Sequence, residues 1–256
     1  FEQELVSMCA ETYNALILAA AGNENIEQAH YPSSYEDIIS VTASGQNNSW
    51  NNWATYHSTV DIASPGESIH SCVNNGSGYS SWSGTSMASP VAASVAGLMK
   101  SLNPSWDAKQ IETMIIGTAD PIIYDVNPES YLIGKLGSGR VDALQAVITP
   151  LFPRIELAGV DILIQNDDDN QINVGETIEF IGIFLNDENW GDATTPEIFM
   201  SCNSNEINIL NNSFELDNIS PGGVGINFEP FIIEFPNSLD PDLYECSIDF
   251  VSNSNS

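Results

Sequence analysis

The residue with the clearest potential for chemistry is Ser86, in the segment SGTSMASP at 83–90. It directly precedes a predicted helix over 87–102 that is rich in small residues. A serine at a helix N-terminus is surrounded by free backbone N–H groups and the positive end of the helix dipole. Such donors can stabilise the negative charge that forms when a hydroxyl attacks a carbonyl group. Gly84 leaves room for a substrate backbone, and the alternative interpretation is that Ser86 only caps the helix.

Two segments resemble motifs of the subtilisin-like serine proteases. GTSMASP at 84–90 resembles the family's nucleophile segment, and AAAGN at 19–23 resembles the strand end that carries its oxyanion asparagine. The resemblance implies that Ser86 attacks the peptide carbonyl, while the Asn23 amide and the Ser86 backbone N–H hold the oxyanion. Taken alone, Gly-Asn after a strand predicts only a turn. The residues that the resemblance implies to contact the substrate are Ala21, Gly22, His30, Gly84 and Thr85.

Three shorter segments agree with this resemblance in order and spacing. They are YPSSY at 31–35, DIASPG at 61–66 and SGRVDA at 138–143. Together the matches cover about residues 1–148, which resemble the C-terminal half of a subtilisin-like domain. The resemblance implies protein or peptide substrates and a reaction that needs no cofactor.

The histidines depart from the family pattern. The triad of this family runs Asp, His, Ser along the chain, with the histidine far upstream of the serine. Here the three histidines are His30, His57 and His70, and neither an Asp-Thr-Gly nor a His-Gly-Thr-His motif is present. The chain also opens at Phe1 within a predicted helix. We therefore expect the N-terminal half of the peptidase domain, with the catalytic Asp and His, to be missing from this sequence. A serine without a base is a weak nucleophile, so this chain alone is predicted to be inactive.

The elements that must position Ser86 and Asn23 follow from hydrophobic periodicity. Apolar residues recur at helical spacing over 1–13, and the run ALILAAA at 15–21 predicts a buried parallel strand. Further strands are predicted at 38–43 and 60–63, and a second long helix at 106–117. Alternating strands and helices predict an α/β domain with a parallel sheet. The resemblance implies that residues 1–150 form a three-layer subtilisin-like half-domain.

Residues 151–256 show a different pattern. Apolar and polar residues alternate over 197–202 and 244–250, and clusters of Asn, Asp, Gly and Pro separate such runs. This predicts an all-β, antiparallel Ig-like sandwich of about seven strands. Cys202 and Cys246 both fall on the apolar faces, so they are either buried apolar residues or a disulfide.

The charge is strongly acidic, with 35 Asp and Glu against 5 Lys and Arg. Residues 1–150 carry 15 acids and 4 bases, and the remaining 106 carry 20 acids and 1 base. A net charge of −30 repels nucleic acid and anionic lipid, so neither is an expected partner. An acidic, lysine-poor chain without a run of about 20 apolar residues fits a secreted, extracellular protein.

Two segments could hold a structural Ca²⁺ ion. The resemblance implies that Asp61, with the backbone carbonyls of Ser33, Tyr35 and Ile38, forms the family's weaker cation site. Alternating acids over 166–176 suit oxygen-preferring Ca²⁺, and this segment resembles openings of bacterial extracellular sandwich repeats. Its candidate ligands are Asp167, Asp169 and Glu176. Ordinary solvated loops are the alternative for both segments.

Two other functions remain compatible with the sequence. One is an inactive pseudoprotease, in which the catalytic Asp and His have been lost. The other is an acidic extracellular binding or adhesion module, in which the sandwich is the functional part. Catalytic Asp and His motifs upstream of Phe1 in the coding sequence would distinguish the protease from both.

Overall fold

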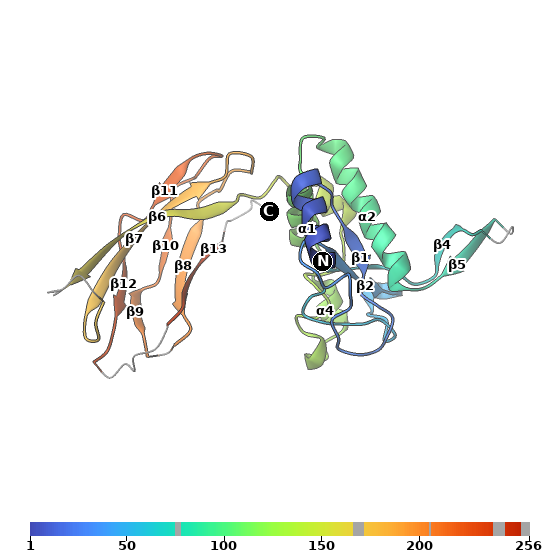
Figure 1. Ribbon diagram of the computed structural model, residues 1–256, viewed down its shortest axis with the longest axis horizontal. Helices are drawn as coiled ribbons and strands as arrows, with labels where there is room; N and C mark the ends of the chain where they lie inside the picture. The colour runs from blue at the N-terminus through green and yellow to red at the C-terminus, as the bar shows by residue number, and fades with distance from the viewer. Residues whose placement is uncertain (75–77, 166–171, 205, 238–243, 252–256) are drawn as a thin grey trace. The chain divides into compact units, whose positions relative to one another are not determined.

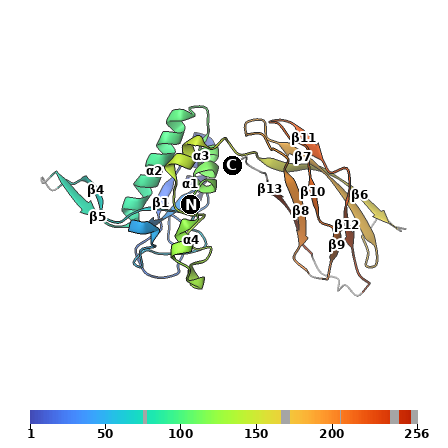
Figure 2. The ribbon, with the colours of Figure 1, turned by 180° about the vertical axis from the view of Figure 1, so that it is seen from behind.

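The structure is a computed structural model that describes residues 1–74, 78–165, 172–204, 206–237 and 244–251. The chain divides into two compact units, Phe1–Thr149 and Pro150–Ser256 (Figures 1 and 2). No helix in these ranges is long and apolar enough to cross a membrane.

The first unit is built on a parallel sheet in the order β1-β2-β3. Its strands are β1 (Leu18–Ala20), β2 (Ile39–Ser44) and β3 (Ile62–Pro65). All six residues of β2 are buried, because this strand is paired on both sides. The run at 15–21 contains the predicted parallel strand, but the prediction that this strand is buried is wrong, because the residues of β1 are only half-buried. The reason is that β1 pairs with β2 alone in the described sheet.

Helices surround this sheet and follow the predicted periodicity. They are α1 (Glu2–Tyr13), α2 (Thr85–Leu102), α3 (Ala108–Gly117), α4 (Ile122–Val126) and α5 (Ala143–Ile148), with short 3₁₀ turns at Gln46–Asn48 and Ser130–Leu132. α2 packs across all three strands (Figure 1). Its buried face includes Ala88, Ala92 and Ala96, whose small side chains allow the helix to lie close to the sheet.

An antiparallel hairpin that is not evident from the sequence pattern joins β3 to α2. It consists of β4 (Ile69–Cys72) and β5 (Tyr79–Trp82), and both views show it extending away from the parallel sheet (Figures 1 and 2). Both strands are short and mostly exposed, which explains why no alternating apolar pattern indicated them.

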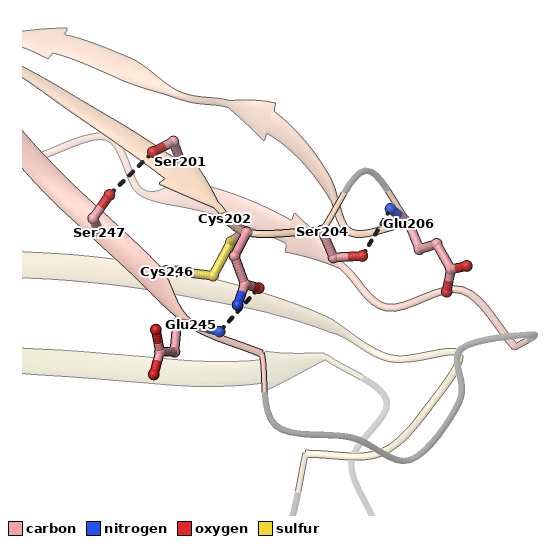
Figure 3. Close-up of a disulfide and its surroundings, with 8 residues drawn as sticks. Ser201, Cys202, Ser204, Glu206, Glu245, Cys246 and Ser247 are labelled. Atoms are coloured by element: carbon pink, nitrogen blue, oxygen red, sulfur yellow. Dashed lines mark hydrogen bonds between the residues drawn. A yellow bond between two sulfur atoms is a disulfide. The ribbon is translucent and has the colours of Figure 1, made fainter. Parts of the chain in front are cut away.

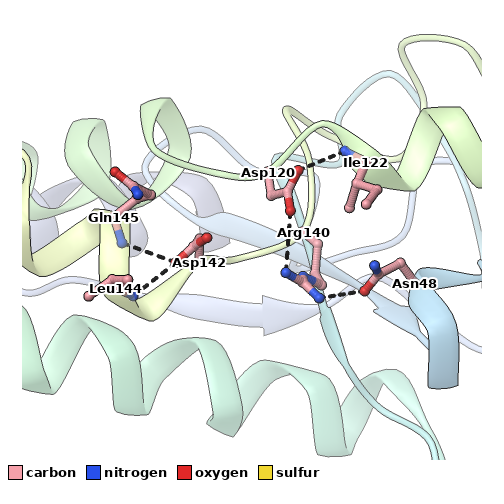
Figure 4. A network of polar contacts seen from close by, with 7 residues as sticks. All are labelled: Asn48, Asp120, Ile122, Arg140, Asp142, Leu144 and Gln145. Carbon is pink, nitrogen blue, oxygen red and sulfur yellow. Dashed lines mark hydrogen bonds and ion pairs between the residues drawn. The ribbon is translucent and has the colours of Figure 1, made fainter. Parts of the chain in front are cut away.

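The segment around Arg140 fastens the end of the first unit to the sheet. Arg140 forms an ion pair with Asp120 at 3.3 Å and a hydrogen bond with Asn48 (Figure 4). Its backbone lies beside Ala63 of β3, in a parallel bridge. Gly137, at φ 79°, is needed here because a Cβ atom would lie 2.3 Å from the carbonyl carbon of Asp61.

The second unit consists of two antiparallel sheets, as the alternating pattern predicts. One has the order β10-β8-β13, and the other has the order β11-β7-β12-β9 with β6 also paired to β7. The buried core between them includes Phe184, Ile198, Ile219 and Phe231. The strand bounds are β6 Ile155–Gln165, β7 Thr177–Asn186, β8 Glu197–Cys202, β9 Asn208–Asn211, β10 Ser213–Glu215, β11 Val224–Ile226, β12 Phe231–Glu234 and β13 Cys246–Val251.

A disulfide joins Cys202 and Cys246, which lie directly opposite each other on β8 and β13 (Figure 3). Next to it, the hydroxyl oxygens of Ser201 and Ser247 are 3.0 Å apart in a hydrogen bond. Of the two alternatives left open by the sequence, the structure therefore supports the disulfide. Cys9 and Cys72 are not in disulfides.

Candidate active site

Ser86 lies in the first turn of α2, with its side chain exposed. Gly84 precedes the helix, and its N–H donates a hydrogen bond of 2.8 Å to the carbonyl of Gly66. A Cβ atom on Gly66 would lie 2.7 Å from the Ala43 Cβ and 3.0 Å from the Ala88 Cβ. Gly66 therefore allows the start of α2 to pack directly on β2, which fixes where Ser86 is presented.

Asn23 follows β1 and is hydrogen-bonded to the same helix start. Its Oδ1 accepts hydrogen bonds from the backbone N–H of Thr85 at 2.9 Å and from the Thr85 hydroxyl at 3.0 Å. Since the oxygen is occupied by these two donors, the Nδ2 group of the amide is left to donate elsewhere. Asn23 and Ser86 line one hollow of about 480 Å³, together with Ser81, Trp82, Ser83, Gly84 and Met87.

Thr85 is fully buried and connects the start of α2 to the segment that follows β1. In addition to its bond with Asn23, its hydroxyl accepts a hydrogen bond of 3.3 Å from the N–H of Gly22. The structure thus places Thr85 behind the hollow and not on its surface. No local pattern predicts this role of Thr85, because the contacts link residues 62 and 63 positions apart.

Gly22 and His30 lie close together beside Asn23. A Cβ atom on Gly22, which has φ 107°, would lie 2.9 Å from Cδ2 of His30 and 2.7 Å from the Thr55 hydroxyl. Glycine is therefore required at this position. Ala21 is buried, and His30 is half-buried with its Nδ1 unpaired among the described residues.

None of the three histidines, all within the described ranges, hydrogen-bonds to Ser86. His57 Nδ1 bonds to the Thr59 hydroxyl at 3.0 Å, and His70 Nδ1 to the Ser81 hydroxyl at 3.2 Å. His70 does line a second groove of about 340 Å³ that also reaches Ser86, between the β4–β5 hairpin and α2. Its ring is stacked on Tyr79, however, with 5.7 Å between the ring centroids. Neither Trp82 nor His70 was predicted to line a hollow with Ser86. The position of Trp82, directly before the segment 83–90, could have indicated that its side chain lies near Ser86.

Asp61, the first candidate cation ligand, lies just before β3. Its Oδ2 accepts a hydrogen bond of 2.7 Å from the N–H of Ser40. Burial raises the pKa of Asp61 to about 6; the Ser40 hydrogen bond opposes this shift and the nearby Glu112 carboxylate adds to it. No group of three or more His, Cys, Asp or Glu side chains gathers as a metal site in the part of the chain that the structure describes.

The second candidate cation segment is only partly described. Asp167 and Asp169 lie outside the described residues. Glu176 accepts a hydrogen bond of 2.6 Å from the N–H of Asn173, so its carboxylate closes a local turn.

The buried Asp61 predicts a pH dependence of stability. Between about pH 4 and pH 6 the unfolded carboxyl ionises while the folded one keeps its proton, so stability falls as the pH rises. Two pKa units set an upper limit of about 3 kcal/mol, which partial contact with water reduces. In urea unfolding at pH 4 and pH 7, Asp61→Asn should remove this loss of stability, because an amide does not ionise in this range. Its oxygen can still accept the hydrogen bond from the N–H of Ser40, so the local structure is kept. The exposed Asp125→Asn should keep it, and equal pH dependence in both variants would contradict the prediction.

Residues 3–147 match the family model described as "Subtilase family", and the chain belongs to this family. It is 43% identical over 133 residues to thermitase of Thermoactinomyces vulgaris, covering 52% of this chain and 44% of thermitase. It is 36% identical over 137 residues to halolysin of Haloferax mediterranei, covering 52% and 24% respectively. The chain thus spans less than half the length of these curated relatives.

Solved structures agree with the family assignment. The prenylagaramide maturation protease PagA is similar at a TM-score of 0.52 and 26% identity, over 57% of this chain and 54% of that protein. The patellamide maturation protease PatA is similar at a TM-score of 0.51 and 28% identity, over the same shares. The predicted subtilisin-like α/β fold of the first unit is confirmed.

Proposed function

We propose that this chain is part of a serine endopeptidase in which Ser86 forms the acyl-enzyme. The observation that carries the proposal is the pair of hydrogen bonds from Thr85 to the Asn23 oxygen, next to the exposed Ser86. In this arrangement the Asn23 Nδ2 group and the Ser86 backbone N–H can both stabilise the oxyanion. Gly84, Gly22 and Ala21 border the bound peptide, and His30 contributes to the wall of its side-chain pocket.

The general base and its orienting acid come, in this proposal, from polypeptide outside these 256 residues. Two facts support it: none of the three histidines of the chain bonds to Ser86, and the chain spans less than half of its curated relatives. That additional polypeptide would complete the peptidase domain and is the main partner we infer, besides a protein or peptide substrate.

A fluorophosphonate, which reacts with activated serines, tests the proposal. Protein made from the complete coding sequence should be labelled at Ser86, and Ser86→Ala should remain unlabelled. The 256-residue chain should react at least about 100-fold more slowly, because its serine lacks a base. The neighbouring Ser83→Ala is the matched control and should keep the label. Absence of labelling in the complete protein would instead favour the alternative function, a pseudoprotease.

The second unit is proposed to be an Ig-like accessory domain of a secreted protein. Its two antiparallel sheets and its disulfide support this, because disulfides persist in oxidising, extracellular environments.

We also propose that a structural Ca²⁺ ion binds at Asp61, or at Asp167, Asp169 and Glu176. Stabilisation by CaCl₂ but not by MgCl₂ in urea unfolding is expected; no difference between the salts would count against both sites.

A further inference from the structure

A hollow of about 500 Å³ lies in the second unit, between β10 and β11. These are end strands of the two sheets, and no further strand pairs with them in the described ranges. Apolar side chains from both strands, from the residue after β10 and from the turn after β11 line the hollow: Phe214, Leu216, Val224, Ile226 and Phe228. Phe228 is 85% exposed and Val224 is 57% exposed, so a large apolar surface is open to water here.

The turn that carries Phe228 is held in place by Asn227, which is only 2% exposed. The Asn227 Oδ1 accepts a hydrogen bond of 2.7 Å from the N–H of Gly182, and its Nδ2 donates to the carbonyls of Glu229 at 2.9 Å and Phe180 at 3.3 Å. The exposure of Phe228 is therefore fixed by buried polar contacts and does not result from a loose loop.

The inner surface of the hollow, at Gly225 of β11, is held by close packing against buried side chains. A Cβ atom on Gly225 would lie 2.5 Å from Cδ1 of Ile219 and 3.3 Å from Cδ1 of Leu216, so β11 packs directly on the core at this point. Ile219 and Leu216 are 1% and 5% exposed. A ligand in the hollow would meet a rigid surface and would lose little affinity to ordering of the protein.

Three acids, Glu215, Asp217 and Glu229, also line the hollow. Residues 151–256 contain 20 acids and a single base, Arg154. Arg154 is paired with Glu156 at 2.9 Å and lies 3.8 Å from Asp187. The unit thus has no further base to neutralise the three carboxylates, and all three would attract a cationic ligand electrostatically.

We propose that this hollow binds a basic, extended segment of a partner protein, with a bulky apolar side chain against Phe228 and lysine or arginine side chains beside the three acids. The free edges of β10 and β11 can pair with an extended main chain, and a cation over the Phe228 ring adds a favourable contact. A second copy of this chain fits poorly, because each copy carries a net charge of −30. The proposal is independent of the proposed proteolysis.

A fluorescein-labelled nonapeptide that alternates lysine with valine and phenylalanine is the probe, measured by fluorescence anisotropy with the 256-residue chain at 0.15 M NaCl. We expect micromolar binding, weakened at least about 10-fold by Phe228→Ala and by the triple variant Glu215→Gln, Asp217→Asn, Glu229→Gln. Phe228 is mostly exposed, so its replacement leaves the core intact, and thermal melting of each variant verifies the fold.

The matched control removes three exposed acids that do not line the hollow, through Asp161→Asn, Glu206→Gln and Asp249→Asn, and should change binding less than about 2-fold. Equal weakening by both triple variants would overturn the proposal, because general charge attraction would then explain the binding. Equal binding of a peptide with serine at the apolar positions would also overturn it. So would self-association of the unliganded chain that Phe228→Ala abolishes.

Discussion

Replacing Asn23 by aspartate in the complete protein should lower kcat for peptide cleavage by about 10²–10³-fold or more, with a small change in KM. That figure is the measured effect of deleting the oxyanion amide of a subtilisin, a member of the same family. An aspartate keeps an oxygen that can accept from the N–H and hydroxyl of Thr85, so the start of α2 stays anchored. It loses the Nδ2 donor and adds negative charge where the oxyanion forms.

The matched control is Asn25→Asp, which makes the same chemical change two residues away at another exposed position. It should leave kcat within about 2-fold. The melting temperatures of both variants should stay close to that of the unchanged protein. If Asn23→Asp kept normal kcat, or if it lost activity only through unfolding, Asn23 would not be an oxyanion donor.

Removing the disulfide by Cys202→Ala and Cys246→Ala should destabilise the second unit by about 4 kcal/mol. The two cysteines are 44 residues apart, and the chain-entropy model assigns roughly this value to a loop of that length. Amide hydrogen exchange should therefore become faster in β8 and β13 and remain unchanged in β2 of the first unit. The same result is expected when the unmodified protein is treated with dithiothreitol.

The control for this change is the pair Cys9→Ser and Cys72→Ser, because neither cysteine is in a disulfide. These substitutions should leave exchange in β8 and β13 unaltered. Unchanged exchange after loss of Cys202 and Cys246 would mean that the sheet pairing alone holds these strands.

Much of the fold follows from local sequence pattern. The helical spacing over 1–13, the small residues of α2 and the alternation in β8 and β13 each predicted an element that the structure contains. The β4–β5 hairpin and the half-buried state of β1 were missed. Their burial depends on which strands and helices lie next to them, and a local pattern carries no information about that.

For the candidate site, the residue types could be predicted from the sequence alone, because the segments at 19–23 and 84–90 are contiguous and each contains one of the two candidate catalytic residues. How the two segments act together depends on the packed chain, in which Thr85 is buried and its hydroxyl and N–H hold the oxygen of Asn23. Strand register and helix docking minimise the free energy of the whole packed chain, so contacts between residues 62 and 63 positions apart cannot be read from either segment alone.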